Sequence, residues 1–220
     1  MTTGQFDSAA DGSAIRPDNG MDAVVDGIFE HLAANLHGLP HDFTVAMRTR
    51  LEQLEKVNAD RIVDEPARSN LRVTLAVVVG YRAILPKLGR AAAIAALRAA
   101  FVEPLNDFVR EHILRTLDEA EDPFATMVAA SKDREQNDFG SGFTFDRPID
   151  DNSRYHLNVT SCFYHDVLVA HSVPELAPIM CEFDTNWIDA IDPDTHGFRF
   201  SRTTTIGYGG THCPFHFERT

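Results

Sequence analysis

A cysteine stands where an expected strand runs into an expected helix. Residues 155–160 alternate between apolar and polar side chains, which is typical of a half-buried strand. The alternation then stops, and Thr160 or Ser161 offers a hydroxyl that can cap a helix. Cys162 would lie in the first turn, where free amides and the helix dipole favour a thiolate. The sequence therefore predicts a reactive thiol at Cys162, with a small buried cysteine that only fills space as the alternative.

A second candidate is a carboxylate on an expected helix over residues 174–191. Asp184 lies at the edge of an apolar stripe on this helix, and Cys181 lies one turn earlier on an adjacent surface. A carboxylate beside apolar side chains is costly to bury unless it is paired. Asp184 is therefore either a solvated residue at the helix edge or a group that points into a cleft, as a base or as the orienter of one. The stripe itself comprises Leu176, Met180, Phe183, Trp187 and Ile191.

An arginine lies among apolar residues on an expected strand over residues 198–206. The even positions of this strand share one face, and that face is apolar at both ends, so Arg202 should point inward. An inward arginine needs an anion, either Asp184 or a substrate carboxylate that its planar fork can bind. The alternative is a β-bulge that turns Arg202 to solvent.

The three cysteines raise the question of a metal. Cys162, Cys181 and Cys213 fall on three separate expected elements, and Cys213 shares the buried face of a last strand over residues 212–218. No C-x-x-C pair is present, and zinc sites usually contain such a tight pair. We expect no metal and no cofactor. The alternative is a metal-dependent hydrolase or lyase, in which the three cysteines bind the metal and His165 or Asp184 is the fourth ligand.

The elements that must position these residues change in kind along the chain. We expect residues 1–19 to form a disordered head, residues 20–135 a helical subdomain, and residues 136–220 an α+β subdomain that carries the site, all in one compact unit. The fold class is thus α+β, with an N-terminal helical bundle packed on a C-terminal antiparallel sheet and two or three helices. Expected helices span residues 21–36, 43–57, 67–85, 90–119 (kinked or split at Pro104), 123–134 and 174–191, with one more opening at Cys162, and expected strands span 139–145, 154–160, 198–206 and 212–218.

The amino-acid composition indicates which classes of binding partner this protein can have. The 220 residues carry 33 acidic and 20 basic side chains, a net charge of −13, which argues against nucleic acid and anionic membranes as partners. No apolar run is long enough to span a membrane, and the N-terminus lacks the apolar core of a secretory signal. We therefore expect a cytoplasmic protein with free thiols that acts on a small molecule. A homo-oligomer stays open.

The same residues carry a resemblance to a known family. The C-terminal region resembles the L-2-amino-thiazoline-4-carboxylic acid hydrolase family over roughly residues 70–217. The resemblance rests on a combination of short motifs rather than on any single one. These motifs are Asn158-Val159-Thr160 followed by Cys162-Phe163-Tyr164, Cys181 with Asp184, Arg202-Thr203-Thr204-Thr205, and Gly210 with His212-Cys213-Pro214-Phe215.

This resemblance implies hydrolytic opening of a cyclic C–S/C=N centre, which yields an N-carbamoyl cysteine from the aminothiazoline. On that hypothesis, the Cys162 thiolate attacks the amidine-like carbon or holds the water that does. Asp184 acts as a base, Arg202 holds the substrate carboxylate, and Asn158 donates to the developing charge. Further substrate contacts are expected from Tyr164, Thr204, Cys181 and Cys213. A small-molecule-binding domain without turnover is the other alternative.

Overall fold

The chain folds into a run of helices followed by a four-stranded antiparallel sheet with further short helices, so the α+β prediction is confirmed. The computed structural model describes residues 20–220, and the expected disordered head lies outside the described residues. The α-helices are α1 (Gly20–Asn35), α2 (Phe43–Val57), α3 (Glu65–Leu88), α4 (Arg90–Glu119), α5 (Pro123–Arg134), α6 (Phe163–Ala170), α7 (Ala177–Glu182), α8 (Thr185–Ile188) and α9 (Pro193–His196). The strands are β1 (Thr144–Asp150), β2 (Arg154–Ser161), β3 (Phe198–Ser201) and β4 (Cys213–Arg219). Shorter turns are η1 (Ala59–Arg61), the π-helical η2 (Glu135–Phe139), η3 (Gly140–Gly142), η4 (Pro174–Leu176) and η5 (Ile206–Tyr208).

Local sequence signals fix where the long helices begin. The Asp64 carboxylate accepts from the amide of Ala67 at 2.8 Å and so caps α3, and Asp122 caps α5 in the same way. Each of these helices has a proline in its first turn. A proline costs no hydrogen bond there, because the N–H groups of the first turn have no acceptor within the helix. Asp64 also accepts from the amide and hydroxyl of Ser141. This second contact ties the start of α3 to the segment that leads into the sheet.

The sheet has the order β1-β2-β4-β3, and its first strand differs from the prediction. A strand was expected over residues 139–145 and a loop after it, but β1 runs from Thr144 to Asp150 and the preceding residues form helical turns. The strand includes Pro148, and its pairing with β2 is irregular between Asp146 and Ile149. An edge strand tolerates proline because its outer N–H groups need no partner strand.

Strand β3 is shorter than expected, and Pro214 explains why. The prediction placed this strand at residues 198–206, whereas pairing with β4 ends at Ser201, opposite His216. The amide of Arg219 donates to the β2 side and that of Thr220 to the β3 side, so the even-numbered residues of β4 face β3. The next even residue back is Pro214, which has no N–H to donate. The chain therefore leaves the sheet at Arg202.

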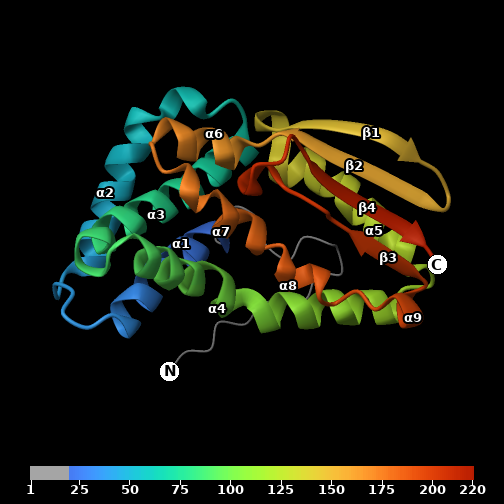
Figure 1. The fold of residues 1–220 in the computed structure, drawn as a ribbon, viewed down its shortest axis with the longest axis horizontal. Helices are drawn as coiled ribbons and strands as arrows, with labels where there is room; N and C mark the ends of the chain where they lie inside the picture. The colour runs from blue at the N-terminus through green and yellow to red at the C-terminus, as the bar shows by residue number, and fades with distance from the viewer. Residues whose placement is uncertain (1–19) are drawn as a thin grey trace.

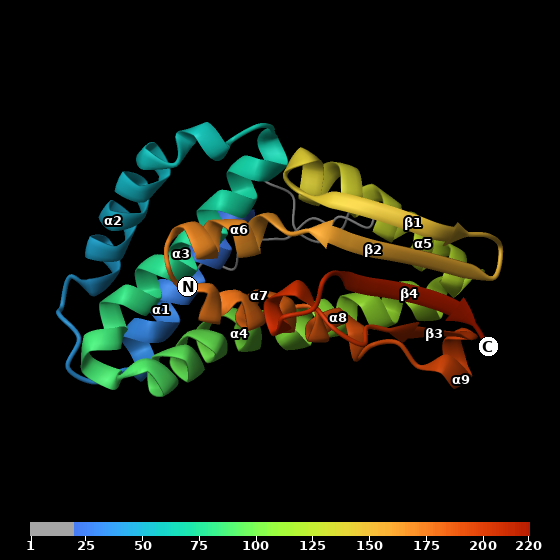
Figure 2. The ribbon, with the colours of Figure 1, turned by 45° about the horizontal axis from the view of Figure 1, so that its top comes forward.

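The helical part and the sheet lie side by side, and α4 reaches from one to the other (Figure 1). Its first half packs with α1 and α3 in a core that also takes in α6 and α7. Its second half packs with α5, α8 and one face of the sheet in a second core. Figure 2 shows α5 behind the sheet, and no helix within residues 20–220 covers the other face of the sheet. Phe145 and Phe215 pack against both cores, so the two cores meet where the helical part joins the sheet.

The helices continue through prolines that were expected to break them, and one expected helix is broken at polar residues instead. Helix α4 continues through Pro104 without being split, and α3 continues past Pro86 to Leu88. By contrast, the single helix expected over residues 174–191 is broken into η4, α7 and α8, with Asp184 at the start of α8. The Thr185 hydroxyl donates to the carbonyl of Glu182 at 2.7 Å within this break. Among the described helices, none combines the length and apolar character needed to cross a membrane.

Candidate functional site

A cavity of about 250 Å³ lies at the junction of the helical part and the sheet. This volume is far above the roughly 10–15 Å³ that one water needs, so the cavity can hold a small molecule. Its wall is built from α3, α4, the η2 turn, the segment from β2 into α6, the α7–α8 break and the start of β4. Six of the eight residues predicted for the site line it, namely Cys162, Tyr164, Cys181, Asp184, Arg202 and Cys213.

Cys162 lies at the strand-to-helix corner, as the residue that precedes the first turn of α6. We expected Thr160 or Ser161 to be the cap and the thiol to be acidified, and the structure differs on both points. Burial raises the pKa of the Cys162 thiol to about 12, although the backbone amides of His165 and Tyr164 act in the opposite direction. Desolvation of the charged form outweighs a short helix terminus. The Cys162 thiol is therefore protonated at neutral pH.

Asp184 and Arg202 form an ion pair in the cavity wall. One guanidinium nitrogen of Arg202 donates to the carboxylate, and the other donates to the carbonyl of Cys181 at 3.0 Å. The indole N–H of Trp187 donates to the second carboxylate oxygen at 3.1 Å. Burial raises the pKa of Asp184, while Arg202 and Trp187 lower it. The pair thus holds a carboxylate in a fixed orientation at the edge of the hollow.

The other two thiols, Cys181 and Cys213, also line the cavity, and the charge of Asp184 acts on both. Burial raises the pKa of Cys213 to about 11, and the Cys213 sulfur accepts from the amide of Ile206 at 3.2 Å. Burial also raises the pKa of Cys181, whereas a hydrogen bond with the Thr205 side chain lowers it. A Cβ on Gly207 would lie 2.7 Å from the Cys181 sulfur, so only glycine fits there.

Tyr164 reaches the cavity with its hydrogen-bond direction already fixed. The side-chain amide of Asn70 donates to the carbonyl of Asp138 at 2.9 Å, so its oxygen must face the other way. That oxygen accepts from the Tyr164 hydroxyl at 2.9 Å. Because the phenol proton is committed to Asn70, the phenol oxygen can only accept from a ligand. Burial raises the pKa of Tyr164, which keeps the phenol neutral.

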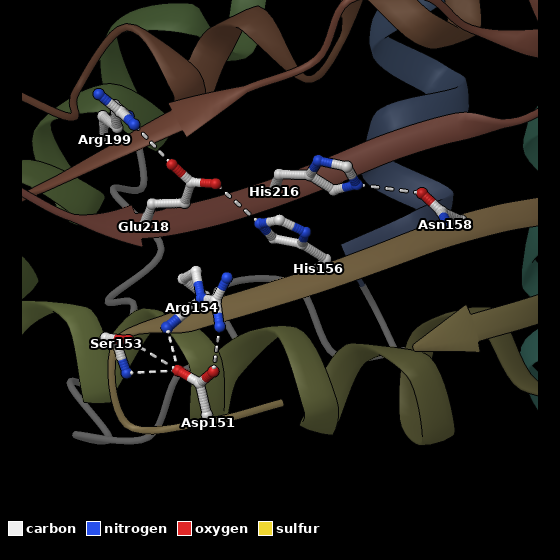
Figure 3. Close-up of polar contacts among 8 residues, drawn as sticks. All are labelled: Asp151, Ser153, Arg154, His156, Asn158, Arg199, His216 and Glu218. Carbon is white, nitrogen blue, oxygen red and sulfur yellow. Dashed lines mark hydrogen bonds and ion pairs between the residues drawn. The ribbon is translucent and has the colours of Figure 1, made fainter. Parts of the chain in front are cut away.

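Two residues predicted for the site lie outside the cavity wall. Asn158 is on the open face of the sheet, where its side-chain oxygen accepts from His216 at 3.1 Å (Figure 3). The strand alternation that turns Val159 into the cavity turns Asn158 away from it. Thr204 is also absent from the wall, and its neighbour Thr205 lines the cavity instead. The expected roles of Asn158 and Thr204 are therefore corrected.

Sequence reasoning missed several polar residues of the wall, of which Asn70 and Arg134 matter most for the chemistry. Asn70 is buried on α3, and its only sequence signal is an amide inside an otherwise apolar helical stripe. Arg134 is the last residue of α5, and an arginine near a helix C-terminus has an ordinary explanation in the helix dipole. The π-helical turn that follows Arg134 has no clear signal in the sequence.

The family model for L-2-amino-thiazoline-4-carboxylic acid hydrolase matches residues 69–217. The chain belongs to this family. The match begins next to Asn70 on α3 and ends in β4, so it includes every predicted site residue. No curated protein and no solved structure matches the chain.

Membership indicates a hydrolase, as the family's description states. The metal alternative of the sequence analysis gains no support, because in residues 20–220 no three His, Cys, Asp or Glu side chains are grouped so that they could hold a metal ion. The cavity instead combines neutral thiols, a paired carboxylate and an oriented phenol oxygen. This combination suits covalent or acid–base chemistry on a small polar ring.

Proposed function

We propose that the protein hydrolyses a cyclic thiazoline- or amidine-like carboxylate in this cavity, with Cys162 as the nucleophile. The observation that carries the proposal is that Cys162, Asp184 and Tyr164, from different elements, line one hollow of small-molecule size. The family description supports the same reaction class. Most of the remaining wall is apolar, which suits a five-membered ring.

The proposed reaction begins with transfer of the thiol proton. Because Cys162 is protonated at neutral pH, a base must remove the proton as the sulfur attacks the ring carbon between sulfur and nitrogen. We assign this role to Asp184, because it lines the cavity and burial makes it a stronger base than an exposed aspartate. The ring C–S bond then breaks with its electron pair on the ring sulfur, which takes up the proton.

The intermediate is an isothiourea that joins the Cys162 sulfur to the former ring carbon. Water then attacks this carbon and delivers a proton to Asp184, the C–S bond to Cys162 breaks, and the cysteine sulfur regains its proton. One water is consumed, one ring C–S bond is lost and one carbonyl is formed, so an aminothiazoline carboxylate would give N-carbamoyl cysteine. Tyr164 accepts a hydrogen bond from the exocyclic amino group, because its oxygen can only accept.

The test is a comparison of three single cysteine variants with L-2-aminothiazoline-4-carboxylate as substrate. Cys162→Ser should lose turnover by about 1,000-fold or more, in the range seen when nucleophiles are removed. Intact-protein mass spectrometry of quenched wild type should show a covalent adduct, and peptide mapping should locate it at Cys162. Cys181→Ser and Cys213→Ser should retain that adduct, even where their turnover falls.

Full turnover by Cys162→Ser would exclude covalent catalysis at this thiol. An adduct mapped to Cys181 would keep the reaction but move the nucleophile. One observation favours a second candidate, a binding domain without turnover, because a thiol whose pKa is about 12 forms little thiolate at neutral pH. Saturable binding of the aminothiazoline to wild type without product would identify that function.

A further inference from the structure

Arg202, the arginine expected to bind the substrate carboxylate, is already occupied. Its two terminal nitrogens donate to Asp184 and to the Cys181 carbonyl, and its guanidinium lies 5.4 Å from the centre of the Phe215 ring. Only 12% of its side chain is exposed. Its charge is balanced by Asp184, so a second carboxylate at Arg202 would have to compete with the first. A carboxylate substrate therefore needs another cation in the wall.

Arg134 is the other arginine that lines the cavity. Its side chain is 25% exposed, and its ion pair with Asp138 is long, with 4.0 Å between the charged atoms. The charge of Arg134 also acts on Asp184, where it favours the ionised carboxylate. Arg134 and the proposed base therefore line the same cavity, close enough for the charge of one to act on the other. The planar fork of an arginine is the group that suits a carboxylate best.

The backbone that carries Arg134 is clamped from both sides. It precedes the π-helical turn η2, whose first residue, Glu135, is 4% exposed. The Glu135 carboxylate accepts from the hydroxyl of Tyr155 and pairs with Arg147. At the far end of η2, Asn70 donates to the carbonyl of Asp138. A buried charge and a buried amide thus hold a rare helix type that is frequent at functional sites.

We propose that Arg134 binds the carboxylate group of the substrate and sets the preference of the site for carboxylates over neutral analogues. The inference rests on the proposed function for the kind of ligand and assigns the binding residue within that site. Arg202 is then a positioning residue for Asp184. The ligand would lie with its carboxylate at the α5–η2 junction, its amino group at Tyr164 and its ring toward the thiols.

The experiment measures binding rather than turnover. The Cys162→Ser protein is titrated calorimetrically with L-2-aminothiazoline-4-carboxylate and with its neutral carboxamide, with and without Arg134→Gln. Loss of a charge-assisted, bidentate contact should weaken carboxylate binding about 10- to 100-fold, with the carboxamide changed by less than about threefold. Arg134→Lys should recover part of the preference, because it keeps the charge and loses the fork.

Arg115→Gln is the matched control. Like Arg134→Gln, it removes one positive charge, here from an exposed side chain of α4 that does not line the cavity. The charges of Arg115 and Arg134 both lower the pKa of His112. Arg115→Gln should leave the carboxylate preference unchanged. Three outcomes would overturn the inference. Arg134→Gln could weaken binding of the carboxylate and the carboxamide equally, or leave the preference for the carboxylate unchanged. The preference could also be lost in Arg202→Gln and kept in Arg134→Gln. These outcomes leave the role of Cys162 untouched, which the adduct and turnover tests decide separately.

Discussion

The two faces of the sheet carry similar residue types in opposite surroundings. On the open face, His156 donates to Glu218 at 2.9 Å, Glu218 pairs with Arg199 at 2.6 Å, and His216 donates to Asn158 (Figure 3). The two imidazole rings stack 4.0 Å apart. The covered face instead leads to the cavity, where Cys213 of β4 joins Asp184 and Arg202. Histidine, glutamate and asparagine look like catalytic residues in a sequence, yet His156, His216, Glu218 and Asn158 do not line the cavity described above.

The difference teaches that covering helices, more than residue types, decide which side chains of the sheet border a cavity. On the open face, hydrogen bonds with Arg199 and His156 lower the pKa of Glu218. The pair with the exposed Arg199 contributes little stability. On the covered face, burial raises the pKa values of the thiols and of Asp184. Groups with raised pKa values that line a hollow are the ones that can exchange protons with a ligand.

The strongest test of this comparison is Asp184→Asn. As the proposed base on the covered face, its loss should lower kcat by about 100- to 10,000-fold. Unpairing Arg202 should also cost about 3 kcal/mol of unfolding free energy. Steady-state kinetics and urea unfolding measure the two effects.

Two variants separate the catalytic effect from the structural one. Asp184→Asn combined with Arg202→Gln removes both charges, so stability should recover in part while turnover stays low. Asp189→Asn makes the same substitution at an exposed position five residues later and should change neither property. Recovery of turnover together with stability in the double variant would show that Asp184 is only a structural partner.

A second prediction concerns the pH dependence of thiol reactivity on the covered face. Because the pKa of Cys162 is raised to about 12, its thiolate fraction should grow about tenfold with each pH unit from 7 to 10. An unperturbed cysteine, with a pKa of about 8.5, would level off above pH 9. Alkylation by iodoacetamide, followed peptide by peptide with mass spectrometry, measures each thiol separately.

Urea-unfolded protein supplies the reference in that experiment, since its three thiols should all level off near the ordinary value. Fluorescence recorded at each pH must show that the protein stays folded. A folded-state Cys162 that levels off between pH 6 and 8 would contradict the burial argument and restore the acidified thiol predicted from the helix terminus.

Much of the fold could be predicted because its signals are local. The bounds of α2, α4 and α5 follow from periodicity and caps, and β2 from alternation. The pairing of Asp184 with Arg202 was predicted from side-chain direction, and the resemblance to the family added Cys162 to them. Asn158 was misplaced although the same alternation, applied strictly, turns it away from Val159.

The remaining errors come from interactions between distant segments. The η2 turn depends on Glu135 meeting Tyr155 and Arg147, and no local pattern specifies that meeting. Strand β3 ends early because of Pro214 on another strand. The pKa of Cys162 was predicted in the wrong direction because the sequence shows the helix terminus but not the depth of burial, and burial dominates.

The smallest expected effect belongs to Asn158→Ala on the open face. His216 would lose its acceptor, which should cost about 1 kcal/mol of unfolding free energy in a half-buried setting. Because Asn158 faces away from the cavity, kcat/KM should change by less than about twofold. Asn70→Ala removes the group that orients Tyr164. Its loss of kcat/KM, expressed as a free energy, should therefore exceed its loss of unfolding free energy. A loss of more than about tenfold in Asn158→Ala with a stable fold would mean that the open face takes part in the reaction, and the contrast between the two faces would no longer hold.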